Sequence, residues 1–552
     1  MKSAQLKNSI MGLFIGLIAI SLPQKNYAQS DGFEVVKNLE LIDLIYRNLD
    51  MYYVDKPVPG KIMKAGIDAM LRELDPYTVF IAESNIEDYR LMTTGQYGGI
   101  GALIRSKGDY VIVTEPYENN PAFNAGLKAG DVILSIDGVP MKGKASDEVS
   151  AALKGPKGST ISVEVDRPGA GKKTVKITRD EIKIPDVPYA AIIQDNVGYI
   201  KLSSFTQTAY SEVKKAYDRL KGEGMEKLIF DLRGNGGGLL IESVKIVNMF
   251  VPKGQEVVST RGRIQEENRV YVALDKPTDL DIPLVVLVDE GSASASEIVS
   301  GALQDLDRAV IIGSTTFGKG LVQRTMDLKY GSKVKLTIAK YYTPSGRCIQ
   351  KLDYSGRKDG ERPKEIEDSL LLAFTTKNGR QVKDGRGIEP DIKIEEDQFS
   401  RLTAMLVIEN ILFDFATQFA IKNNKIDAVD VFAISEQTYE EFKQFAIEKE
   451  FTYTTASEEM LNKFMEVAED ESYLKKDSPE YKAIYELVHP SKERDLEKFR
   501  PEIIELLENE IVSRYYFQSG RIINSFKYDE AMVEALNVLS DLTKYQHVLS
   551  GK

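Results

Sequence analysis

Pro283-Leu-Val-Val-Leu-Val288 runs directly into Asp289-Glu-Gly-Ser-Ala-Ser-Ala-Ser-Glu297, and this stretch decides the fold class. An unbroken run of Leu and Val predicts a strand that is buried on both faces, as in a parallel sheet covered by helices. The small residues after it predict a turn, and the pattern of Ala295 to Leu306 predicts a helix. The sequence therefore predicts a strand–turn–helix unit with several serines in its turn.

The same pattern recurs on both sides of that unit. Leu228 to Leu232 and Ala309 to Gly313 are short apolar runs, and Leu239 to Phe250 has helical spacing. Strands that alternate with helices are typical of an α/β layer with parallel strands. We expect such a layer over Val197 to Asp397.

The composition bounds the class of protein. The chain has 552 residues, of which 42% are hydrophobic and 28% charged, and its formal net charge is −12. This length predicts about three or four domains. The acidic balance disfavours nucleic acid as a partner, because phosphate binding needs a basic face. Cys348 is the only cysteine, so no internal disulfide can form and no metal site can be built from Cys and His clusters.

The N-terminal residues have the pattern of an export signal. Lys2 and Lys7 give a positive start, Ile10 to Leu22 carries no charge, and a polar step leads to a cleavage point at Ala28. The apolar run is short for a membrane span, which needs about 20 residues, so a removed signal peptide is favoured. A retained N-terminal membrane anchor is the alternative.

Two regions before the α/β layer have their own patterns. Helical spacing at Val35 to Tyr52 and at Lys61 to Leu74 predicts a small helical entry segment. From Gln96 the chain changes to short apolar strands punctuated by glycine, which predicts a compact sheet-and-helix module. Its strands are expected at Tyr110 to Thr114, Asp131 to Ile136 and Ile161 to Val165, with a helix at Ser146 to Leu153.

Beyond Arg401 the sequence predicts an almost wholly helical region that is rich in Glu and Lys. Met405 to Ile421 is expected to be its most apolar helix. A stripe of Leu402, Leu406 and Ile411 is typical of core packing rather than of a docking surface.

Ser294 stands at the predicted strand-to-helix turn. There its hydroxyl can stand clear of the sheet, and the next backbone N–H can face a developing oxyanion. The chain has only two histidines, both near the C-terminus, so a nucleophilic serine here would give its proton to something other than imidazole. Ser–Lys pairs are a known variant of the serine triad. The alternative is that Ser292, Ser294 and Ser296 merely cap the helix.

Lys319 lies in Thr316-Phe-Gly-Lys-Gly320, just after the predicted strand that ends at Gly313. Neighbouring strands could place it beside the serine turn. A lysine acts as a base only when neutral, so burial would have to lower its pKa by roughly 3 from about 10.4. Gln323 could hold the ammonium in place. A surface-loop lysine is the alternative, whereas a phosphate-binding loop is excluded because Gly320 follows the lysine.

A glycine-rich turn, Asp231-Leu-Arg-Gly-Asn-Gly-Gly-Gly238, lies between a predicted strand and a predicted helix. Its N–H groups could supply a second oxyanion donor or bind a substrate backbone. A tight connection without further function is the alternative.

Together these elements resemble the C-terminal processing peptidases, or tail-specific proteases, of the S41 serine peptidase family. The resemblance extends from Val35 to about Asp397. The matching motifs are Asp231-Leu-Arg-Gly-Asn-Gly-Gly-Gly238, Gly291-Ser-Ala-Ser-Ala-Ser-Glu297, Phe317-Gly-Lys-Gly-Leu-Val-Gln323, Tyr342-Thr-Pro-Ser-Gly-Arg347 and Gly387-Ile-Glu-Pro-Asp391.

The resemblance implies roles for single residues. It implies Ser294 as nucleophile, Lys319 as general base and Gln323 as the orienting amide. It also implies an oxyanion hole made by the N–H of Ala295 and by one of the glycines Gly236, Gly237 and Gly238. Asp305, on the following helix, is expected to have a supporting structural role.

The resemblance also implies a multidomain α/β architecture. We expect a serine peptidase core with ClpP/crotonase-like layers, an inserted PDZ domain, an N-terminal helical segment and a C-terminal helical extension. The expected boundaries are residues 1–28 for the signal peptide, 31–92 for the helical segment, 93–182 for the PDZ domain, 183–397 for the core and 398–552 for the extension.

The PDZ domain is expected to bind a peptide's terminal carboxylate at the loop formed by Gly98, Gly99, Ile100 and Gly101. An incoming tail would add a strand beside Ala102 to Ile104. A spacer without a ligand is the alternative.

We therefore expect an exported serine endopeptidase, in the periplasm or on the periplasmic side of a membrane. It would cleave proteins near apolar C-terminal tails by acyl-enzyme chemistry, without a metal or other cofactor. The extension could serve a homo-oligomer or an adaptor. One alternative is a non-catalytic protein that binds tails, and a second is a Ser-His-Asp hydrolase that uses His489; His547 and His489 are otherwise expected to be surface or packing residues.

Overall fold

The computed structural model describes residues 27–355, 361–395 and 398–551. The predicted signal peptide lies outside these residues as far as residue 26. The chain divides into two compact units, Met1–Pro76 and Tyr77–Lys552. The smaller unit contains α2 (Tyr27–Tyr52) and α3 (Pro59–Arg72), which confirm the two helices predicted there.

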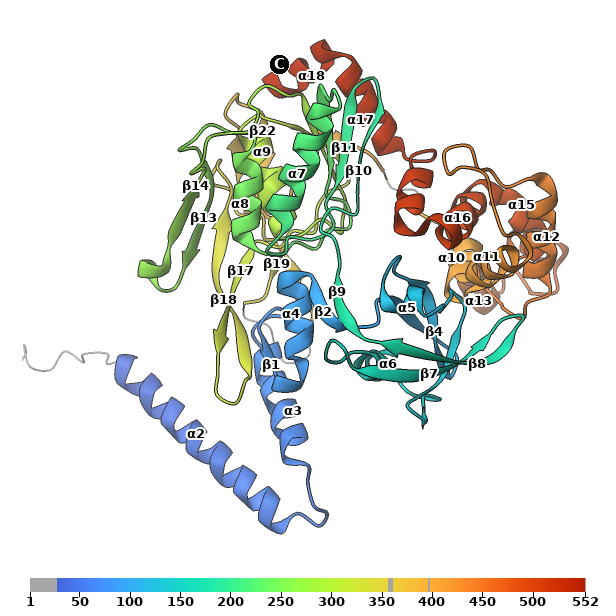
Figure 1. The fold of residues 1–552 in the computed structure, drawn as a ribbon, viewed down its shortest axis with the longest axis horizontal. Coiled ribbons are helices and arrows are strands. Elements are labelled where there is room, and N and C mark those ends of the chain that lie inside the picture. The colour runs from blue at the N-terminus through green and yellow to red at the C-terminus, as the bar shows by residue number, and fades with distance from the viewer. Residues whose placement is uncertain (1–26, 356–360, 396–397, 552) are drawn as a thin grey trace, which may run out of the picture. The chain divides into compact units, whose positions relative to one another are not determined.

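The larger unit contains a six-stranded sheet packed with α7 (Ala209–Gly222), α8 (Leu240–Asn248) and α9 (Ala295–Asp305), as Figure 1 shows. The strand order in this sheet is β10-β11-β12-β15-β16-β23. All neighbouring pairs are parallel except β10 with β11 at one edge, which confirms the predicted parallel layer. Its strands are β10 (Tyr189–Gln194), β11 (Val197–Lys201), β12 (Lys227–Asp231), β15 (Leu284–Val288), β16 (Val310–Gly313) and β23 (Ile392–Lys393).

Helices cover both faces of this sheet, because successive residues of a strand point to opposite faces. Phe230 and Val286 pack on one face in a core that includes α7, α8 and α9. Ile229 and Leu287 pack on the other face against α17 (Glu530–Ser540) and α18 (Leu542–Ser550). The last two helices of the predicted extension therefore cover one face of the core sheet.

A second sheet lies beside the core and carries Gln323. It contains β1 (Val79–Ile81), β13 (Glu256–Gly262), β14 (Arg269–Val272), β17 (Leu321–Asp327) and β18 (Lys333–Tyr342). Two small hairpins follow, β19 (Leu352–Asp353) with β20 (Lys364–Glu365) and β21 (Ala373–Thr375) with β22 (Gln381–Lys383). Short 3-10 helices are η1 (Glu83–Asn85), η2 (Gln265–Glu267) and η3 (Asp368–Leu370).

The segment predicted as a PDZ domain has its own sheet, in the order β3-β4-β5-β7-β8 with β6 beside β5, and its own apolar core. Strand β3 lies at the edge of this sheet, where an added strand can pair. The elements are β3 (Ala102–Lys107), β4 (Tyr110–Pro116), α5 (Pro121–Asn124), β5 (Val132–Ile136), β6 (Val139–Pro140), α6 (Ser146–Leu153), β7 (Thr160–Arg167) and β8 (Gly171–Thr178). Before and after it lie α4 (Ile86–Thr94) and the pair β2 (Gln96–Gly99) and β9 (Asp180–Lys183).

A C-terminal helical domain has a separate core and runs from α10 to α16. Its helices are α10 (Arg401–Ile408), α11 (Ile411–Lys422), α12 (Glu436–Ile447), α13 (Ala456–Asp470), α14 (Pro479–Val488), α15 (Lys492–Lys498) and α16 (Arg500–Ser525). The predicted stripe of Leu402, Leu406 and Ile411 is buried, which confirms its core role.

The prediction of one continuous helix from Met405 to Ile421 is wrong. Asn410 has a left-handed backbone with φ 60°, and α10 and α11 meet there at a bend of 60°. A short polar residue tolerates this conformation, so the apolar pattern continues across a break that it does not reveal. Among the described residues no single helix has the length and apolarity to cross a membrane; this bent pair meets the two criteria together.

Candidate active site

Ser294 occupies a strained turn between β15 and α9. Its φ and ψ are 56° and −108°, whereas a residue that only caps a helix usually has an extended backbone. Positive φ at a residue other than glycine is costly and is concentrated at functional sites. This conformation favours a functional serine over the capping alternative.

The neighbouring serines have structural partners. The Ser292 hydroxyl donates to the Leu232 carbonyl at 2.9 Å, and the Ser296 hydroxyl donates to the Asn235 carbonyl at 2.8 Å. Both serines are fully buried. They fix the turn to the glycine-rich loop and leave Ser294 as the candidate nucleophile.

Glu297, in the first turn of α9, joins the Ser294 turn to the Lys319 loop. Its Oε2 accepts the backbone N–H of Ser294 at 2.7 Å and that of Lys319 at 2.9 Å. Its Oε1 accepts the Thr316 hydroxyl at 2.6 Å and the Gly318 N–H at 2.7 Å. The backbones of Ser294 and Lys319 therefore meet at one carboxylate oxygen, so the Lys319 loop lies beside the Ser294 turn, as the order of the strands predicted.

The Glu297 carboxyl has no exposed surface. Burial raises the pKa of Glu297 above its ordinary value, and the hydrogen bonds from Thr316, Lys319, Gly318 and Ser294 offset only part of that rise. Four donors around one buried carboxylate give a fixed connection that needs no water.

The Lys319 side chain is half-buried, and its Nζ lies 4.1 Å from the centre of the Tyr77 ring. A cation over an aromatic face is attracted by the ring, so Tyr77 helps to position this side chain. The Gln323 amide, on β17, donates to the Thr337 hydroxyl at 3.2 Å. A contact between Gln323 and the Lys319 ammonium stays a prediction, as does proton transfer between Ser294 and Lys319.

Asn235 attaches the glycine-rich loop to the other side of the serine turn. Its carbonyl accepts the Ala293 N–H at 3.0 Å, and its side-chain amide donates to the Leu202 carbonyl at 2.9 Å. Gly237 approaches so closely that an added Cβ would lie 2.6 Å from the Ala293 carbonyl oxygen and 2.9 Å from the Ser294 Cβ. Only glycine fits at this position.

One predicted oxyanion donor has another partner. The Gly237 N–H donates to the Asn235 side-chain oxygen at 2.9 Å, so in this arrangement it is not available to an oxyanion. Ala295 begins α9, where N–H groups have no partner within the helix. Ala295 and Gly236 stay predictions as oxyanion donors.

Two motifs later in the chain contact the segments that carry Ser294 and Lys319. Thr316 exchanges hydrogen bonds with Ile388 of the Gly387-Ile-Glu-Pro-Asp391 motif. Asp305 pairs with Arg347 at 2.8 Å, and both side chains are fully buried. This pair ties the end of α9 to the Tyr342-Thr-Pro-Ser-Gly-Arg347 motif and confirms the supporting role predicted for Asp305.

A buried charge cluster lies at the end of β12, at the start of the glycine-rich loop. Asp231 pairs with Arg233 at 2.8 Å and Lys201 at 3.1 Å, and Tyr199 donates to it at 2.6 Å. Burial alone would raise the pKa of Asp231, but Arg233 and Lys201 outweigh burial and hold it well below its usual range. Arg233 also pairs with Asp529, just before α17, at 2.7 Å.

The loop of the predicted PDZ segment turns its carbonyl groups inward. The Ile100 carbonyl accepts the Ala122 N–H at 2.7 Å, and the Gly101 carbonyl accepts the Tyr117 N–H at 2.9 Å. Burial raises the pKa of Tyr97 to about 12, and backbone hydrogen bonds from Gly101 and Ala102 to its hydroxyl oppose that rise. Carboxylate binding by Gly98 to Gly101 stays a prediction, and it would require the Tyr97 hydroxyl to give up these donors.

Neither histidine lies in the serine turn. The His489 Nδ1 lies 2.8 Å from Glu458, and its ring stacks on Tyr485 at 4.7 Å, all within the C-terminal helical domain. His547 is exposed on α18. The packing of His489 and the exposure of His547 agree with the packing or surface roles predicted for these two residues.

Sequence reasoning missed three residues that position this site: Glu297, Asn235 and Tyr77. A signal existed for Glu297, because Ser followed by Glu three residues later is the pattern of a helix capping box. Asn235 and Tyr77 act through contacts distant in sequence, and no local pattern marks them.

Comparison with known proteins identifies the three main regions. Residues 98–178 match the PDZ domain, residues 196–355 match peptidase family S41, and residues 402–539 match the C-terminal helical domain of probable PDZ-proteases. A probable CtpA-like serine protease of Staphylococcus aureus (strain bovine RF122 / ET3-1) is 35% identical over 435 residues, which are 77% of this chain and 84% of that protein. A carboxy-terminal-processing protease of Bartonella bacilliformis is 36% identical over 347 residues, 62% of this chain and 79% of that protein.

Two solved structures are also similar. The photosystem II D1 C-terminal processing protease is 30% identical, with a TM-score of 0.35, over 63% of this chain and 91% of that chain. A putative S41 protease from Bacteroides fragilis NCTC 9343 is 17% identical, with a TM-score of 0.36, over 62% of this chain and 84% of that chain. With the family match and the 35% identity across most of both chains, this chain belongs to peptidase family S41 and is a serine protease.

Proposed function

We propose that this chain is an exported endopeptidase with a Ser294–Lys319 dyad, which cleaves proteins that present an apolar C-terminal tail. The observation that carries the proposal is the Glu297 carboxylate, which accepts the N–H of Ser294 and of Lys319 on the same oxygen. This arrangement favours lysine as the partner of the serine, since both histidines lie elsewhere.

In the proposed acylation step the Ser294 Oγ attacks the scissile carbonyl carbon, and its proton passes to the neutral Lys319 amine. The N–H groups of Ala295 and Gly236 stabilise the oxyanion. The intermediate then collapses: the peptide C–N bond breaks, and the leaving amine takes the proton from Lys319. A water molecule then attacks the ester carbon and gives a proton to Lys319; the ester C–O bond breaks, and Lys319 returns that proton to the Ser294 Oγ as the acid product leaves.

Gln323 is proposed to orient the Lys319 ammonium from β17. Its amide nitrogen is engaged with Thr337, so its carbonyl oxygen is the atom that would accept from the ammonium. Tyr77 would hold the same ammonium from its ring face.

Tail recognition is proposed for the PDZ domain. The support is the edge position of β3, which allows a tail to add a strand, together with the neighbouring glycine-containing loop of Gly98 to Gly101. The names of the carboxy-terminal-processing relatives agree with a substrate defined by its C-terminal end.

Export is proposed from the pattern of residues 1–28 alone. Fractionation of the native host, followed by N-terminal sequencing of the isolated protein, tests it. A mature chain beginning near residue 29 in the periplasmic or membrane fraction supports export and cleavage. A full-length chain in the cytoplasmic fraction contradicts both.

The enzymatic test uses two peptides of one sequence, one with a free apolar C-terminus and one with a C-terminal amide. The wild-type protein should cleave the free-carboxylate peptide faster. Ser294→Ala and Lys319→Ala should each lower kcat by about 10⁴-fold or more, as loss of a nucleophile or base does in other serine proteases. Turnover at the wild-type level in either variant would overturn the dyad, and His489→Ala should leave kcat unchanged.

A further inference from the structure

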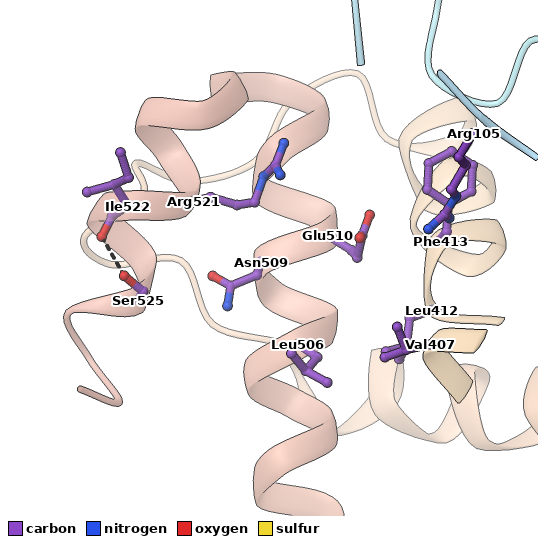
Figure 2. A pocket seen from close by; sticks show the side chains of 10 residues that line it. All are labelled: Arg105, Val407, Leu412, Phe413, Leu506, Asn509, Glu510, Arg521, Ile522 and Ser525. Atoms are coloured by element: carbon purple, nitrogen blue, oxygen red, sulfur yellow. Dashed lines mark hydrogen bonds between the residues drawn. The ribbon is translucent and has the colours of Figure 1, made fainter. Parts of the chain in front are cut away.

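A cavity of about 410 Å³ lies where the PDZ strand β3 meets the C-terminal helical domain. Figure 2 shows Arg105 and Phe413 on one side of it and Leu506, Asn509 and Glu510 of α16 on the other. Val407 and Leu412 add apolar wall. The cavity therefore combines an apolar lining with a few charged groups, as ligand sites commonly do.

The Arg105 guanidinium is attracted by two carboxylates, Glu510 and Asp414, each of which is already paired with another cation. Its Nε and Nη2 are buried and have no hydrogen-bond acceptor among the described residues. Its central carbon lies 4.5 Å from the centre of the Phe413 ring, and the donors on Nε and Nη2 stay unused in this arrangement.

The other cations around the cavity are paired. Arg514 pairs with Glu510 at 3.1 Å, Lys107 pairs with Asp414 at 2.5 Å, and Arg521 pairs with Glu115 of β4. A partly buried guanidinium whose donors lack an acceptor is costly unless a ligand supplies that acceptor. With Arg105, the cluster has four cations and three carboxylates, so one carboxylate from outside would balance it.

The position of Arg105 on β3 indicates where that carboxylate comes from. Ala102 and Ile104 pack against the PDZ core, so Leu103 and Arg105 project from the opposite face of the strand. Leu103 is 44% exposed, which leaves this face open next to the loop of Gly98 to Gly101. A tail added along β3 would present alternate side chains to the same face.

The register then follows from antiparallel pairing. A terminal residue opposite Ala102, next to the loop, puts the residue three positions before it opposite Arg105. Side chains of directly opposed residues have Cβ atoms about 4.5–5.5 Å apart, which is within reach of an ion pair between a carboxylate and Arg105.

We propose that Arg105, held on the Phe413 ring of the helical domain, selects an acidic side chain three residues before the C-terminus of the bound tail. The inference rests on the proposed function, because it assigns a second subsite to the same PDZ groove. The helical domain thereby takes part in substrate selection: it supplies the ring that orients the guanidinium and closes the pocket behind it.

The experiment uses the full chain with Ser294→Ala, so that bound peptides are not cleaved. Fluorescein-labelled peptides that share an apolar free C-terminus carry Glu, Gln or Lys three residues before the end, and fluorescence anisotropy gives each Kd. The Glu peptide should bind roughly tenfold more tightly than the Gln peptide, as one charge-assisted hydrogen bond allows. The Lys peptide should bind most weakly.

Adding Arg105→Gln should bring the Glu and Gln peptides to one Kd, that of the Gln peptide in the parent. Arg105→Lys should keep part of the preference. Phe413→Leu should reduce it, because the guanidinium loses its supporting ring. Lys176→Gln on β8 removes an exposed charge of the same domain and is the matched control; it should leave the preference intact.

Each outcome decides the inference. A wild-type preference for Glu that persists in Arg105→Gln, or tight binding without any preference, overturns this subsite and leaves tail recognition standing. No binding of any free-carboxylate peptide overturns tail recognition itself, and this inference with it. Loss of the preference in Arg105→Gln, with the Gln peptide still bound at its parental Kd, supports the inference and shows that the variant is folded.

Discussion

The region around Ser294 and the region around Arg105 treat buried polar groups in opposite ways. Beside Ser294, the Glu297 carboxylate accepts four donors, and the Asn235 side chain both donates and accepts. Beside Arg105, two guanidinium nitrogens are buried without an acceptor among the described residues. A catalytic site needs polar groups that are fixed before the substrate arrives. A binding site can contain a polar group whose hydrogen bonds are completed only by the ligand.

The largest change in stability is expected at the buried charge cluster around Asp231. Asp231→Asn leaves Arg233 and Lys201 without their carboxylate and should lower the free energy of unfolding by about 3–5 kcal/mol at pH 7. Urea unfolding of both proteins measures it. Asp218→Asn, in an exposed pair with Lys214 on α7, is the control and should change the free energy by less than about 0.5 kcal/mol.

The same pair of proteins tests the pKa of Asp231. Because the folded-state pKa of Asp231 lies below its ordinary value, its contribution is present above about pH 3.9 and is lost as the pH falls further. The difference in unfolding free energy between wild type and Asp231→Asn should therefore shrink by about 1.4 kcal/mol per pH unit below pH 3.9. A difference that stays constant down to pH 3 would contradict the account.

The second effect concerns the connection between the two catalytic segments. Glu297→Gln replaces an acceptor-only group with one that puts its amide N–H against backbone N–H groups, so the Lys319 loop should shift. A misplacement of this kind costs about 10²-fold in kcat. Tail binding should not change, because the PDZ groove is not involved.

Glu290→Gln makes the same chemical change at an exposed position in the same turn, and its kcat should match wild type. Peptide turnover and anisotropy on both variants give the comparison. Wild-type turnover in Glu297→Gln would show that the buried carboxylate does not position the dyad.

Asn235→Ala should lower kcat less than Glu297→Gln does. The backbone bonds of residue 235 persist, and only the side-chain bonds to Gly237 and Leu202 are lost. We expect a loss of about tenfold in kcat with unchanged tail affinity, in keeping with about 1–3 kcal/mol for unsatisfied buried partners. An unchanged kcat would mean that the loop keeps its place without this amide, and a circular dichroism melt monitors folding.

The smallest effect is expected in the recognition region. Tyr97→Phe removes the hydroxyl that accepts from Gly101 and Ala102, so a tail carboxylate no longer competes with it. Tail affinity should rise by about threefold, which is less than one net hydrogen bond. Tyr110→Phe, on β4, is the control and should not change affinity. Weaker binding in Tyr97→Phe would show that the phenol supports the loop rather than occupying it.

Local patterns predicted the elements of the core well. The Leu-Val run before Ser294, the helix after it and the neighbouring strands follow directly from hydrophobic periodicity, and each is present. The motif resemblance marked Ser294, Lys319 and Gln323, and the structure brings the first two segments together at Glu297.

Sequence patterns did not predict the contacts between distant segments or the local break at Asn410. The left-handed Asn410 breaks an apolar pattern that reads as one helix, because the pattern records burial and not backbone direction. The resemblance offers Gly237 as one of several possible oxyanion donors, but its N–H donates to the Asn235 side chain two residues earlier. The cavity beside Arg105 is lined by helices from a much later part of the chain, and no spacing in the sequence predicts it.

The proposed mechanism requires Lys319 to activate Ser294. A serine-reactive fluorophosphonate, followed by peptide mapping with mass spectrometry, tests it most directly on the full chain. The account predicts one modified residue, Ser294, with a labelling rate that falls by about 10²-fold or more in Lys319→Ala and is unchanged in Lys340→Ala, an exposed lysine of β18. Labelling of Lys319→Ala at the wild-type rate, or modification of a different residue in the wild-type protein, would contradict it.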